Sequence, residues 1–320
     1  MSQQKKVLVT ATNYSQLCAE AKQLLEKNNF EIIENPHDRP MKFGELKEII
    51  GDIDAVVAGV DTWDESIFKL APNLKVISRF GVGVDNINLD QAKEYGIQVT
   101  NAPRLNSNAV AELTVNLILN SLRNTVNLHV STRQGHWERF VGTELKGKKV
   151  GLLGFGNIAQ SVAKKLYGFD VELLAYDKFP NKEIAARYDV QFTSYEEILQ
   201  ASDIVSMHLP NLPETHHFMN KERFNQMKQG SYFVNTSRGA LVDEKALYEA
   251  LETGKLQAAA IDVYEKEPIT RDNPLFHFDN IITTPHTAAE SYEVYHSVGL
   301  MTAQAIISVF QETTPDNLLN

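Results

Sequence analysis

The sequence has 320 residues, of which 43% are hydrophobic, and its formal net charge at pH 7 is −10. This length exceeds one typical domain and the apolar fraction suffices for two packed cores, so we expect two domains. An acidic chain without a block of Lys or Arg does not suit nucleic acid as the main partner, because phosphate binding needs a basic face. One cysteine, Cys18, excludes an internal disulfide, and no apolar run approaches the roughly 20 residues that span a membrane. We expect a soluble, cytoplasmic protein without a nucleic-acid or membrane partner.

The first hundred residues alternate short apolar runs with helical patterns. Strands are predicted at Lys6–Thr10, Glu31–Glu34, Ala55–Gly59, Leu74–Ser78 and Gln98–Asn101. Helices are predicted at Ser15–Lys27, Phe43–Ile50, Glu65–Leu70 and Leu89–Tyr95, with Ser15 and Asp64 as N-caps. Such alternation implies a parallel sheet covered on both faces, here a flavodoxin-like unit.

A long apolar-periodic segment from Asn108 to Gln134 predicts a helix that carries the chain into a second domain. Beyond residue 148 the alternation resumes, with later strands predicted at Val190–Phe192, Asp203–Leu209, Ser231–Thr236, Ala258–Val263 and Asn280–Thr284. Helices are predicted at Tyr195–Gln200, Lys221–Lys228 and Glu244–Thr253, with Ser194, Asn220 and Asp243 as N-caps and Gly254 following the last helix. This pattern predicts a Rossmann domain of six to seven strands.

The final predicted helix, Tyr292–Phe310, follows the last strand and is expected to return to the first domain. The fold class is therefore α/β, with two doubly wound parallel-sheet domains. A discontinuous substrate domain is expected at 1–102 plus 289–320, and an NAD-binding domain at 103–288. Ligands in such sheets lie outside the carboxyl ends of the strands, so we expect the active site in the cleft between the two domains.

A dinucleotide fingerprint lies in the middle of the chain. The apolar run Lys148–Phe155 is followed by Gly154-Phe-Gly156-Asn-Ile-Ala159, the G-x-G-x-x-A form of the pattern. Gly154 permits the tight turn, Gly156 leaves room for a pyrophosphate, and the start of the helix 157–167 offers unpaired amides to the phosphates. A second strand, 171–176, ends at Asp177, 21 residues after Gly156. Its carboxylate suits the ribose hydroxyls and repels a 2′-phosphate, which favours NAD over NADP.

Three strand ends in the second domain deliver groups with reactive or ligand-binding side chains. They are Asn235-Thr-Ser-Arg238-Gly, Asp262-Val-Tyr-Glu-Lys-Glu267-Pro and Thr284-Pro-His286-Thr-Ala. Arg238 suits bidentate binding of a carboxylate. His286 suits transfer of a hydroxyl proton, and Glu267, if paired with the other imidazole nitrogen, would favour the protonated ring and fix its tautomer. The remaining histidines have no metal-ligand spacing, so no metal site is expected.

These residues together resemble the D-isomer-specific 2-hydroxyacid dehydrogenase family, over nearly the whole chain. Ser78-Arg-Phe-Gly-Val-Gly-Val-Asp-Asn-Ile, Asn106-Ser-Asn-Ala-Val-Ala-Glu112-Leu, and Trp137 with Gly142-Thr-Glu-Leu-Lys-Gly look most like its phosphoglycerate dehydrogenase branch. The resemblance implies that Arg238 binds substrate, His286 is the acid and base, and Glu267 is its partner. Backbone donors of Val82 and Gly83 would receive the substrate carboxylate, although the same glycines also suit a tight turn. The cofactor residues implied are Gly154, Gly156, Asn157, Ile158, Asp177, Leu209, Pro210, Thr236, Ser237, Arg238, Asp262, His286 and Ala288.

The sequence departs from the phosphoglycerate dehydrogenase pattern at one place. Members of that branch commonly carry an Arg-Ser pair where this chain reads Gly59-Val-Asp-Thr-Trp, and Asp61 has the wrong sign to hold a phosphate. Arg104 is a candidate to compensate, or else an ordinary surface arginine. The regulatory C-terminal domain of many such enzymes is not expected, because the chain ends at Asn320.

We predict an NAD-dependent enzyme that interconverts a D-2-hydroxy acid and its 2-keto acid, with D-3-phosphoglycerate as the leading substrate. One alternative is a reductase of glyoxylate, hydroxypyruvate or another 2-keto acid. An alternative of another class is an NAD-sensing binding protein, similar to the corepressors of the family. The resemblance also implies a homodimer formed through the cofactor domain, with the segment around Trp137 as a contact, although a tryptophan in the core is equally consistent with the sequence.

Overall fold

The computed structural model describes residues 4–37 and 39–320, which form two compact units. Unit 1 contains the residues up to Asn106 together with Glu290–Asn320, and unit 2 contains Ser107–Ala289. Each unit has one sheet, and all strand pairs in both sheets are parallel. The predicted fold class of two parallel-sheet α/β domains is confirmed.

Unit 1 has a five-stranded sheet in the order β2-β1-β3-β4-β5. Its strands are β1 (Lys5–Val9), β2 (Phe30–Glu34), β3 (Ala55–Ala58), β4 (Val76–Arg79) and β5 (Gln98–Thr100). Its helices are α1 (Tyr14–Leu17), α2 (Ala19–Lys27), α3 (Phe43–Ile49), α4 (Glu65–Phe68), α5 (Leu89–Glu94) and α13 (Tyr292–Phe310), with a 3₁₀ turn at Ile50–Asp52. This is the flavodoxin-like strand order.

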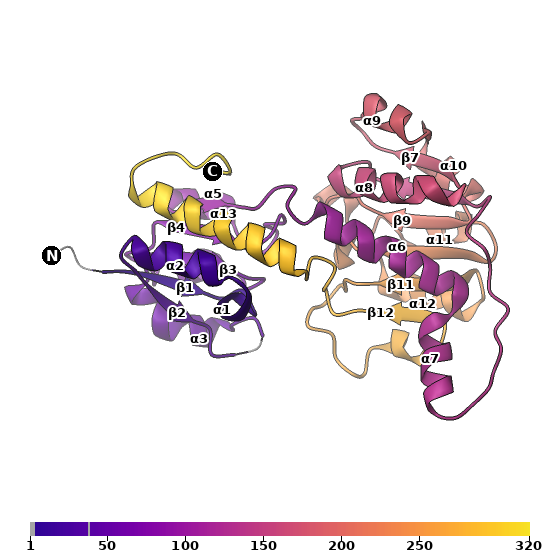
Figure 1. Cartoon of the computed structure of the whole chain (residues 1–320), viewed down its shortest axis with the longest axis horizontal. Helices are drawn as coiled ribbons and strands as arrows, with labels where there is room; N and C mark the ends of the chain where they lie inside the picture. Colours follow the sequence, from indigo (N-terminus) through magenta and orange to yellow (C-terminus); the bar gives the residue numbers. More distant parts are fainter. Residues whose placement is uncertain (1–3, 38) are drawn as a thin grey trace. The chain divides into compact units, whose positions relative to one another are not determined.

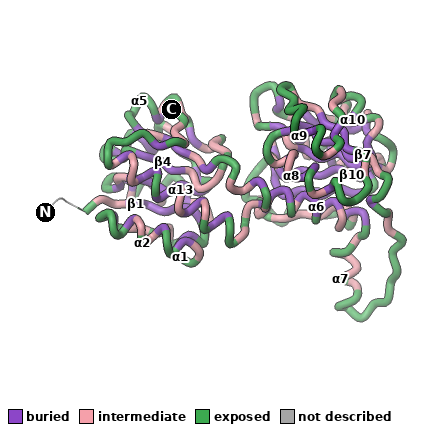
Figure 2. Tube along the Cα trace, turned by 45° about the horizontal axis from the view of Figure 1, so that its top comes forward, coloured by how far each residue is buried: buried purple, intermediate pink, exposed green. Residues whose placement is uncertain are grey.

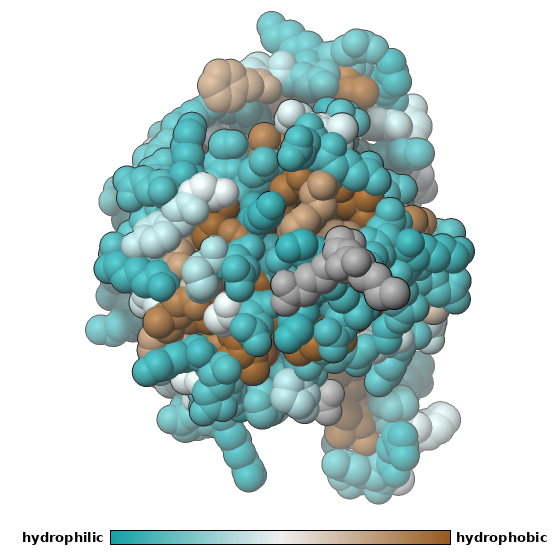
Figure 3. Space-filling model, turned by 90° about the vertical axis from the view of Figure 1, so that its left-hand side faces the viewer, coloured by the Kyte–Doolittle hydropathy of each residue, from teal (hydrophilic) through white to brown (hydrophobic). Residues whose placement is uncertain are grey.

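The C-terminal helix α13 belongs to unit 1. It packs beside α2 and against β4, more than 260 residues away from α2 along the chain (Figure 1). Ala303, Ile306 and Val309 of α13 join one apolar cluster with Val7 and Leu25. Apolar groups on the face seen in Figure 3 form separated patches among hydrophilic side chains. Burial of these apolar side chains between α13, α2 and the sheet stabilises unit 1.

Unit 2 has a seven-stranded sheet in the order β12-β11-β10-β9-β6-β7-β8, the Rossmann order with one further strand. Its strands are β6 (Lys149–Leu153), β7 (Glu172–Tyr176), β8 (Val190–Phe192), β9 (Ile204–Met207), β10 (Ser231–Asn235), β11 (Leu256–Ile261) and β12 (Ile281–Thr283). Its helices are α6 (Ser107–Arg123), α7 (Thr125–Arg133), α8 (Asn157–Leu166), α9 (Lys182–Arg187), α10 (Tyr195–Ala201), α11 (Lys221–Gln226) and α12 (Glu244–Glu252). The 3₁₀ turns are η2 (Tyr167–Phe169), η3 (Pro213–Thr215), η4 (Gly239–Leu241) and η5 (Pro274–His277).

Two predicted helices are wrong in their extent. The helix predicted at 15–27 is split at Cys18, and Ser15 lies inside α1 instead of capping it; the residue before α1 is Asn13, with a φ of 57°. The helix predicted from Asn108 to Gln134 is broken at Asn124, whose φ of 52° is left-handed. A single left-handed residue is not visible in the apolar periodicity, because the pattern is present on both sides of the break.

Other boundaries shift by one or two residues, and α9 was not predicted because its six residues show little apolar periodicity. The predicted N-caps Asp64, Ser194, Asn220 and Asp243 each accept an amide of the following helix. Gly254 follows α12 with a φ of 68°, as predicted.

Candidate functional site

The glycine turn after β6 is shaped by close packing on β9. Leu153 pairs in register with Met207, so the residue that follows each of them lies at the same carboxyl edge of the sheet. Gly154 has a φ of 98°, and a Cβ on it would lie 2.7 Å from the carbonyl carbon and oxygen of His208. Only glycine fits both the dihedral angle and the space.

Gly156 differs from Gly154 in what surrounds it. Its φ is −73°, which any residue adopts, and a Cβ on it would meet no atom of the chain within 4 Å. It is the N-cap residue of α8, so the first amides of that helix lie beside this open space. Ala159, one turn further, is fully buried between the helix and the sheet. Packing within the chain thus explains Gly154 and Ala159 but not Gly156.

Asp177 follows β7 and faces the same turn. Its Oδ2 accepts the amide of Phe155 at 2.6 Å, and its Oδ1 accepts the amide of Phe179 at 2.8 Å. Each carboxylate oxygen retains a further lone pair. Beside it, Lys178 Nζ lies 3.3 Å from Glu214 Oε1, so that neighbouring lysine is engaged by a carboxylate of its own.

The ends of β10, β11 and β12 bring the other predicted residues together. Asn235, Ile261 and Thr283 are aligned across the three strands, so the loops that follow them leave the sheet side by side. The loop after β10 is held by Asn235, whose side-chain amide donates to Arg238 O at 2.9 Å and accepts from the backbone amide of Ser237 at 3.0 Å.

The loops after β10 and β11 touch at Gly239. A Cβ on Gly239 would lie 1.9 Å from the carbonyl carbon and oxygen of Tyr264. Any other residue would therefore separate Arg238 from the segment that carries Glu267. This glycine was not predicted as part of the site, because a close approach between two loops leaves no pattern in the sequence.

His286 and Glu267 form the predicted pair. The Nδ1 atom of His286 lies 2.7 Å from Oε2 of Glu267, and Glu267 Oε1 accepts the amide of Tyr264 at 3.0 Å. Burial opposes ionisation of Glu267, but the hydrogen bond and charge of His286, the Tyr264 amide and the charge of Arg238 together hold the pKa of the carboxyl below its usual value. Glu267 is thus an anion near neutral pH, and the imidazole leaves Nε2 for another partner.

Asp262 organises the loop that carries His286. Its fully buried carboxylate accepts the hydroxyl of Thr284 at 2.6 Å and the amides of Thr287 and Ala288 at 2.9 Å each. The amide of His286 donates to Asp262 O at 2.7 Å, and its φ is 52°. Asp262 therefore fixes a left-handed histidine, a role the sequence did not reveal.

Two more predicted cofactor residues lie at the same edge. The hydroxyl of Thr236 is buried and 2.8 Å from that of Thr114 on α6. Leu209 is buried and Pro210 is exposed after β9. The hydroxyl of Thr236 thus joins the loop after β10 to α6.

A pocket of about 210 Å³ opens over these loops. It is lined by Asn211, Arg238, Gly239, Ala240, Tyr264, Glu265, Glu267 and His286. It brings together all three residues predicted to be catalytic. Burial raises the pKa of Tyr264 to about 12, so its hydroxyl stays protonated and donates to Thr284 O at 2.9 Å.

The predicted substrate residues Val82, Gly83 and Arg104 belong to unit 1. Val82 and Arg104 are exposed, and Val82 O accepts the side-chain amide of Asn101 at 2.7 Å. Arg104 has a left-handed backbone, with a φ of 70°. Their part in substrate binding stays a prediction.

Asp61, which stands where the phosphoglycerate dehydrogenase branch commonly has an Arg-Ser pair, is buried. It is 2% exposed, and its carboxylate accepts the amide of Met41 at 2.5 Å and the hydroxyl of Thr10. Burial raises the pKa of this carboxyl against those hydrogen bonds. Asp61 ties together the segments that follow β1, β2 and β3, so it has a structural role.

Within residues 4–37 and 39–320, no three His, Cys, Asp or Glu side chains are grouped so that they would hold a metal ion. The same residues include no helix with the length and apolar character needed to cross a membrane.

Unit 2 has a glycine turn at the carboxyl edge of a doubly wound sheet. At the ends of other strands of that sheet, an ionised carboxylate holds an imidazole. These two features characterise a dinucleotide-binding α/β protein with an acid–base site. Residues 115–288 match the NAD binding domain of the D-isomer specific 2-hydroxyacid dehydrogenases. The chain belongs to this family.

Relatives with different substrates are similar to the chain. A D-3-phosphoglycerate dehydrogenase of Archaeoglobus fulgidus is 42% identical over 80% of this chain and 49% of its own length. A glyoxylate reductase of Thermofilum pendens is 39% identical over 90% of this chain and 88% of its own length. The crystal structure of a Thermus thermophilus protein, 32% identical, has a TM-score of 0.90 over 98% of this chain and all of that one. The chain thus spans about half the length of its phosphoglycerate dehydrogenase relatives.

Proposed function

We propose that the protein is an NAD-dependent D-2-hydroxyacid dehydrogenase that interconverts a 2-hydroxy acid and its 2-keto acid. Unit 2 is the NAD-binding domain and unit 1 the substrate domain. The observation that carries the proposal is the bond between His286 Nδ1 and Glu267 Oε2 at 2.7 Å, with Arg238 lining the same pocket. A cytoplasmic location stays a prediction.

The residues after β6 fit a dinucleotide. Gly156 borders open space that no side chain of the protein fills, and the amides of Asn157 and Ile158 at the start of α8 suit a pyrophosphate. Asp177 is fixed by two amides with lone pairs to spare for ribose hydroxyls. When bound, NAD supplies the hydride acceptor or donor.

The preference for NAD over NADP is tested at Asp177. We expect Asp177→Ala to weaken NAD binding about tenfold or more, since a hydrogen bond to a charged group contributes about 1.5–3 kcal/mol. The same change should leave NADP binding unaltered or stronger, because the repulsion of its 2′-phosphate is removed. Calorimetric titration of both nucleotides measures this, and an equal loss for both would contradict the assignment.

In the oxidation direction, His286 Nε2 accepts the proton of the substrate hydroxyl as the C2 hydrogen leaves as hydride. In reduction, the same atom returns a proton to the carbonyl oxygen. Glu267 holds the ring through Nδ1 and stabilises the imidazolium that each oxidation step forms. Arg238 binds the substrate carboxylate and aligns C2.

For the substrate we propose D-3-phosphoglycerate, with glyoxylate or hydroxypyruvate as the second candidate. The first is supported by resemblance to the phosphoglycerate dehydrogenase branch. The second is supported by the glyoxylate reductase relative, which this chain matches over 88% of its length.

Steady-state kinetics with phosphorylated and unphosphorylated acids separates the two candidates. If a phosphate is bound, Arg104→Ala should raise KM for phosphoglycerate about tenfold and leave KM for glyoxylate unchanged. Preference for unphosphorylated acids, with no effect of Arg104→Ala, would establish the second. No turnover with any 2-keto acid, together with tight NAD binding, would favour the NAD-sensing binding protein.

We also propose a homodimer formed through unit 2. Helix α7 has no buried residue, and the segment after it is exposed up to Val141 (Figure 2). Trp137 is 88% and Val141 94% exposed, so these apolar side chains lack an apolar environment in a single chain. A second copy is the occupant consistent with the family resemblance. Light scattering should give twice the chain mass, and Trp137→Ser with Val141→Ser should shift it to the monomer; a monomeric parent protein would refute the dimer.

A further inference from the structure

A second histidine–glutamate pair stands at the rim of the proposed catalytic pocket. His217 Nε2 bonds to Oε1 of Glu265, and Glu265 lines the pocket two residues before Glu267. His217 comes from the connection between β9 and β10, whereas Glu265 comes from the loop after β11. The pair therefore joins two loops that no strand pairing connects.

His217 is held by its backbone as well as by its ring. Its amide donates to Ala240 O at 2.8 Å, its φ is 49°, and its imidazole stacks on that of His216 with ring centroids 4.0 Å apart. Ala240 directly follows Gly239, the residue pressed against Tyr264. A histidine fixed in this way loses little entropy when it binds a carboxylate, unlike the long side chains of an ordinary surface ion pair.

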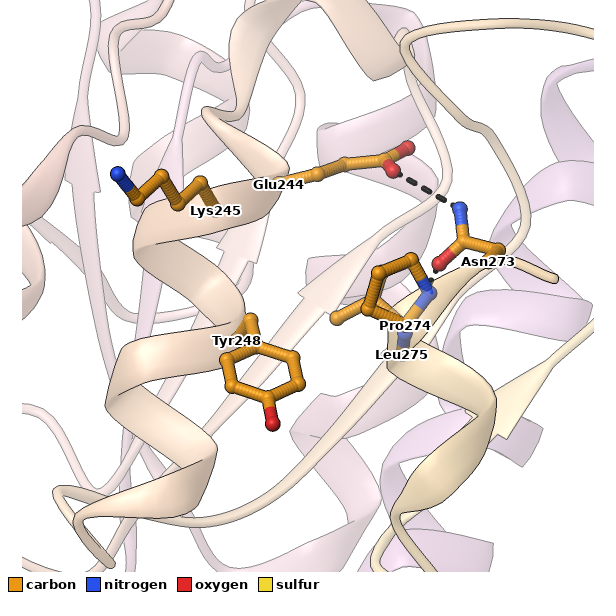
Figure 4. Close-up of a pocket in the computed structure, with 6 residues that line it drawn as sticks. All are labelled: Glu244, Lys245, Tyr248, Asn273, Pro274 and Leu275. Atoms are coloured by element: carbon orange, nitrogen blue, oxygen red, sulfur yellow. Dashed lines mark hydrogen bonds between the residues drawn. The ribbon is translucent and has the colours of Figure 1, made fainter.

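Glu265 is also fixed from the opposite side, by the first residue of α12. The backbone amide of Glu265 donates to Oε1 of Glu244 at 2.8 Å. Oε2 of Glu244 accepts the side-chain amide of Asn273 at 3.0 Å. Figure 4 shows Glu244 extending from α12 toward Asn273, whereas Lys245 points away from it. These groups wall a neighbouring pocket of about 360 Å³ with Tyr248, Pro274 and Leu275. Glu265 is thus held at two points, by Glu244 at its backbone amide and by His217 at its carboxylate.

The segment so fixed is the one that presents Glu267. The amide of Tyr264, adjacent to Glu265, donates to Glu267 Oε1 at 3.0 Å, and Glu267 Oε2 binds His286. A displacement of residues 264–265 would remove this amide from Glu267 and change the angle at which its carboxylate meets the imidazole. A misplacement of about 1 Å costs up to about 100-fold in rate.

We propose that His217 is a positioning residue, which through Glu265 holds the Tyr264–Glu267 segment so that Glu267 orients His286. The proposal rests on the proposed function of His286 and Glu267. Its consequence is a role in turnover for a histidine that is not among the residues lining the pocket.

The test is a double-mutant cycle on 2-keto acid reduction with NADH. His217→Ala should lower kcat roughly tenfold, a part of the 10²–10⁴ that acid–base catalysis supplies, with KM for NADH within about twofold. His217→Gln, which keeps a donor toward Glu265, should restore most of kcat. In a Glu267→Gln background, His217→Ala should have no further effect, because its influence passes through Glu267.

The matched control is His296→Ala. His296 also bonds to an exposed carboxylate, Glu20 at 2.8 Å, but in unit 1 and outside the pocket. It should leave kcat unchanged. If His217→Ala does not fold, Glu265→Ala makes the same comparison from the other partner and should show the same dependence on Glu267.

Full activity of His217→Ala, or a loss that adds to that of Glu267→Gln, would overturn the positioning role. The proposed function fails separately, if replacement of His286 leaves turnover intact. An inactive His286 variant beside a fully active His217→Ala would therefore refute this inference alone.

Discussion

The Nδ1 atom of His286 lies 2.7 Å from Oε2 of Glu267, although the two residues follow different strands of the unit 2 sheet. Three features hold them there: the Tyr264 amide on Glu267, the buried carboxylate of Asp262 under the His286 loop, and the close approach at Gly239. Contacts within the chain thus hold the imidazole with Nδ1 on Glu267, the arrangement that the proposed acid–base role of Nε2 needs.

Substitutions of the two glycines of the fingerprint should have different effects, one on the stability of the fold and the other on NAD binding. Gly154→Ala introduces strain at a φ of 98° and a contact of 2.7 Å with His208, so we expect a loss of about 2 kcal/mol or more in the free energy of unfolding. Gly156→Ala meets no atom of the chain and should change stability by less than about 0.5 kcal/mol while weakening NAD binding. Urea unfolding and NAD titration of both variants measure this. Equal effects of the two changes on NAD binding and stability would contradict the assignment of Gly156 to the cofactor.

Glu267 should contribute to the acid sensitivity of the fold. Its pKa in the folded chain is lowered below 4.5, so the unfolded chain takes up the proton first as the pH falls. The stabilisation is present above that value and is lost as the pH falls through the folded pKa. Glu267→Gln should therefore lose less stability than the parent protein when the pH is lowered from neutrality to below 4.5, as judged by denaturant midpoints. Parallel pH dependence in both proteins would show that Glu267 is not ionised by its partners.

His208 is a base and Glu267 an acid, but His208 should also make the fold less stable as the pH falls. Burial beneath the glycine turn lowers the pKa of its imidazole to about 4, from 6.5, and Ser206 Oγ lies 2.9 Å from Nε2. Below pH 6.5 the His208 imidazole is protonated in the unfolded chain but stays neutral in the folded chain. The free energy of unfolding therefore falls as the pH drops from 6.5 toward 4. The loss is on the order of 2 kcal/mol after allowance for partial exposure.

A neutral replacement tests this effect. In His208→Gln the free energy of unfolding should depend less on pH between 6.5 and 4 than in the parent protein. His296→Gln, at an exposed position, should keep the pH dependence of the parent protein. A slope that persists in His208→Gln would assign the pH dependence to other groups.

The sequence predicts the sheet edges and the helix starts of this chain well, because both depend on local chemistry. Asp64, Ser194 and Asp243 cap helices since their side chains reach amides two or three residues away. Apolar runs likewise predict the strands of two buried parallel sheets. The arrangement of Arg238, Glu267 and His286 follows, because parallel strands deliver their carboxyl ends to one edge.

Long-range contacts between loops could not be predicted in the same way. The bond of His217 to Glu265 spans 48 residues, and the approach of Gly239 to Tyr264 depends on the paths of two loops. The burial of Asp61 was not predicted for the same reason: its partners Thr10 and Met41 lie on other segments, so the burial has no local signal. The left-handed Asn124, which ends α6, is a single dihedral angle that apolar periodicity does not report.

The proposed role of His286 is tested by comparing the parent protein with His286→Asn. The measurement is the fall in NADH absorbance as NADH is oxidised by a 2-keto acid. Asn is chosen because it tolerates the left-handed φ of 52°. We predict turnover by the parent protein and a kcat lower by roughly 10²–10⁴ in the variant, with NADH binding within about twofold. Turnover by His286→Asn at the parent rate would contradict the proposal that this histidine moves the substrate proton.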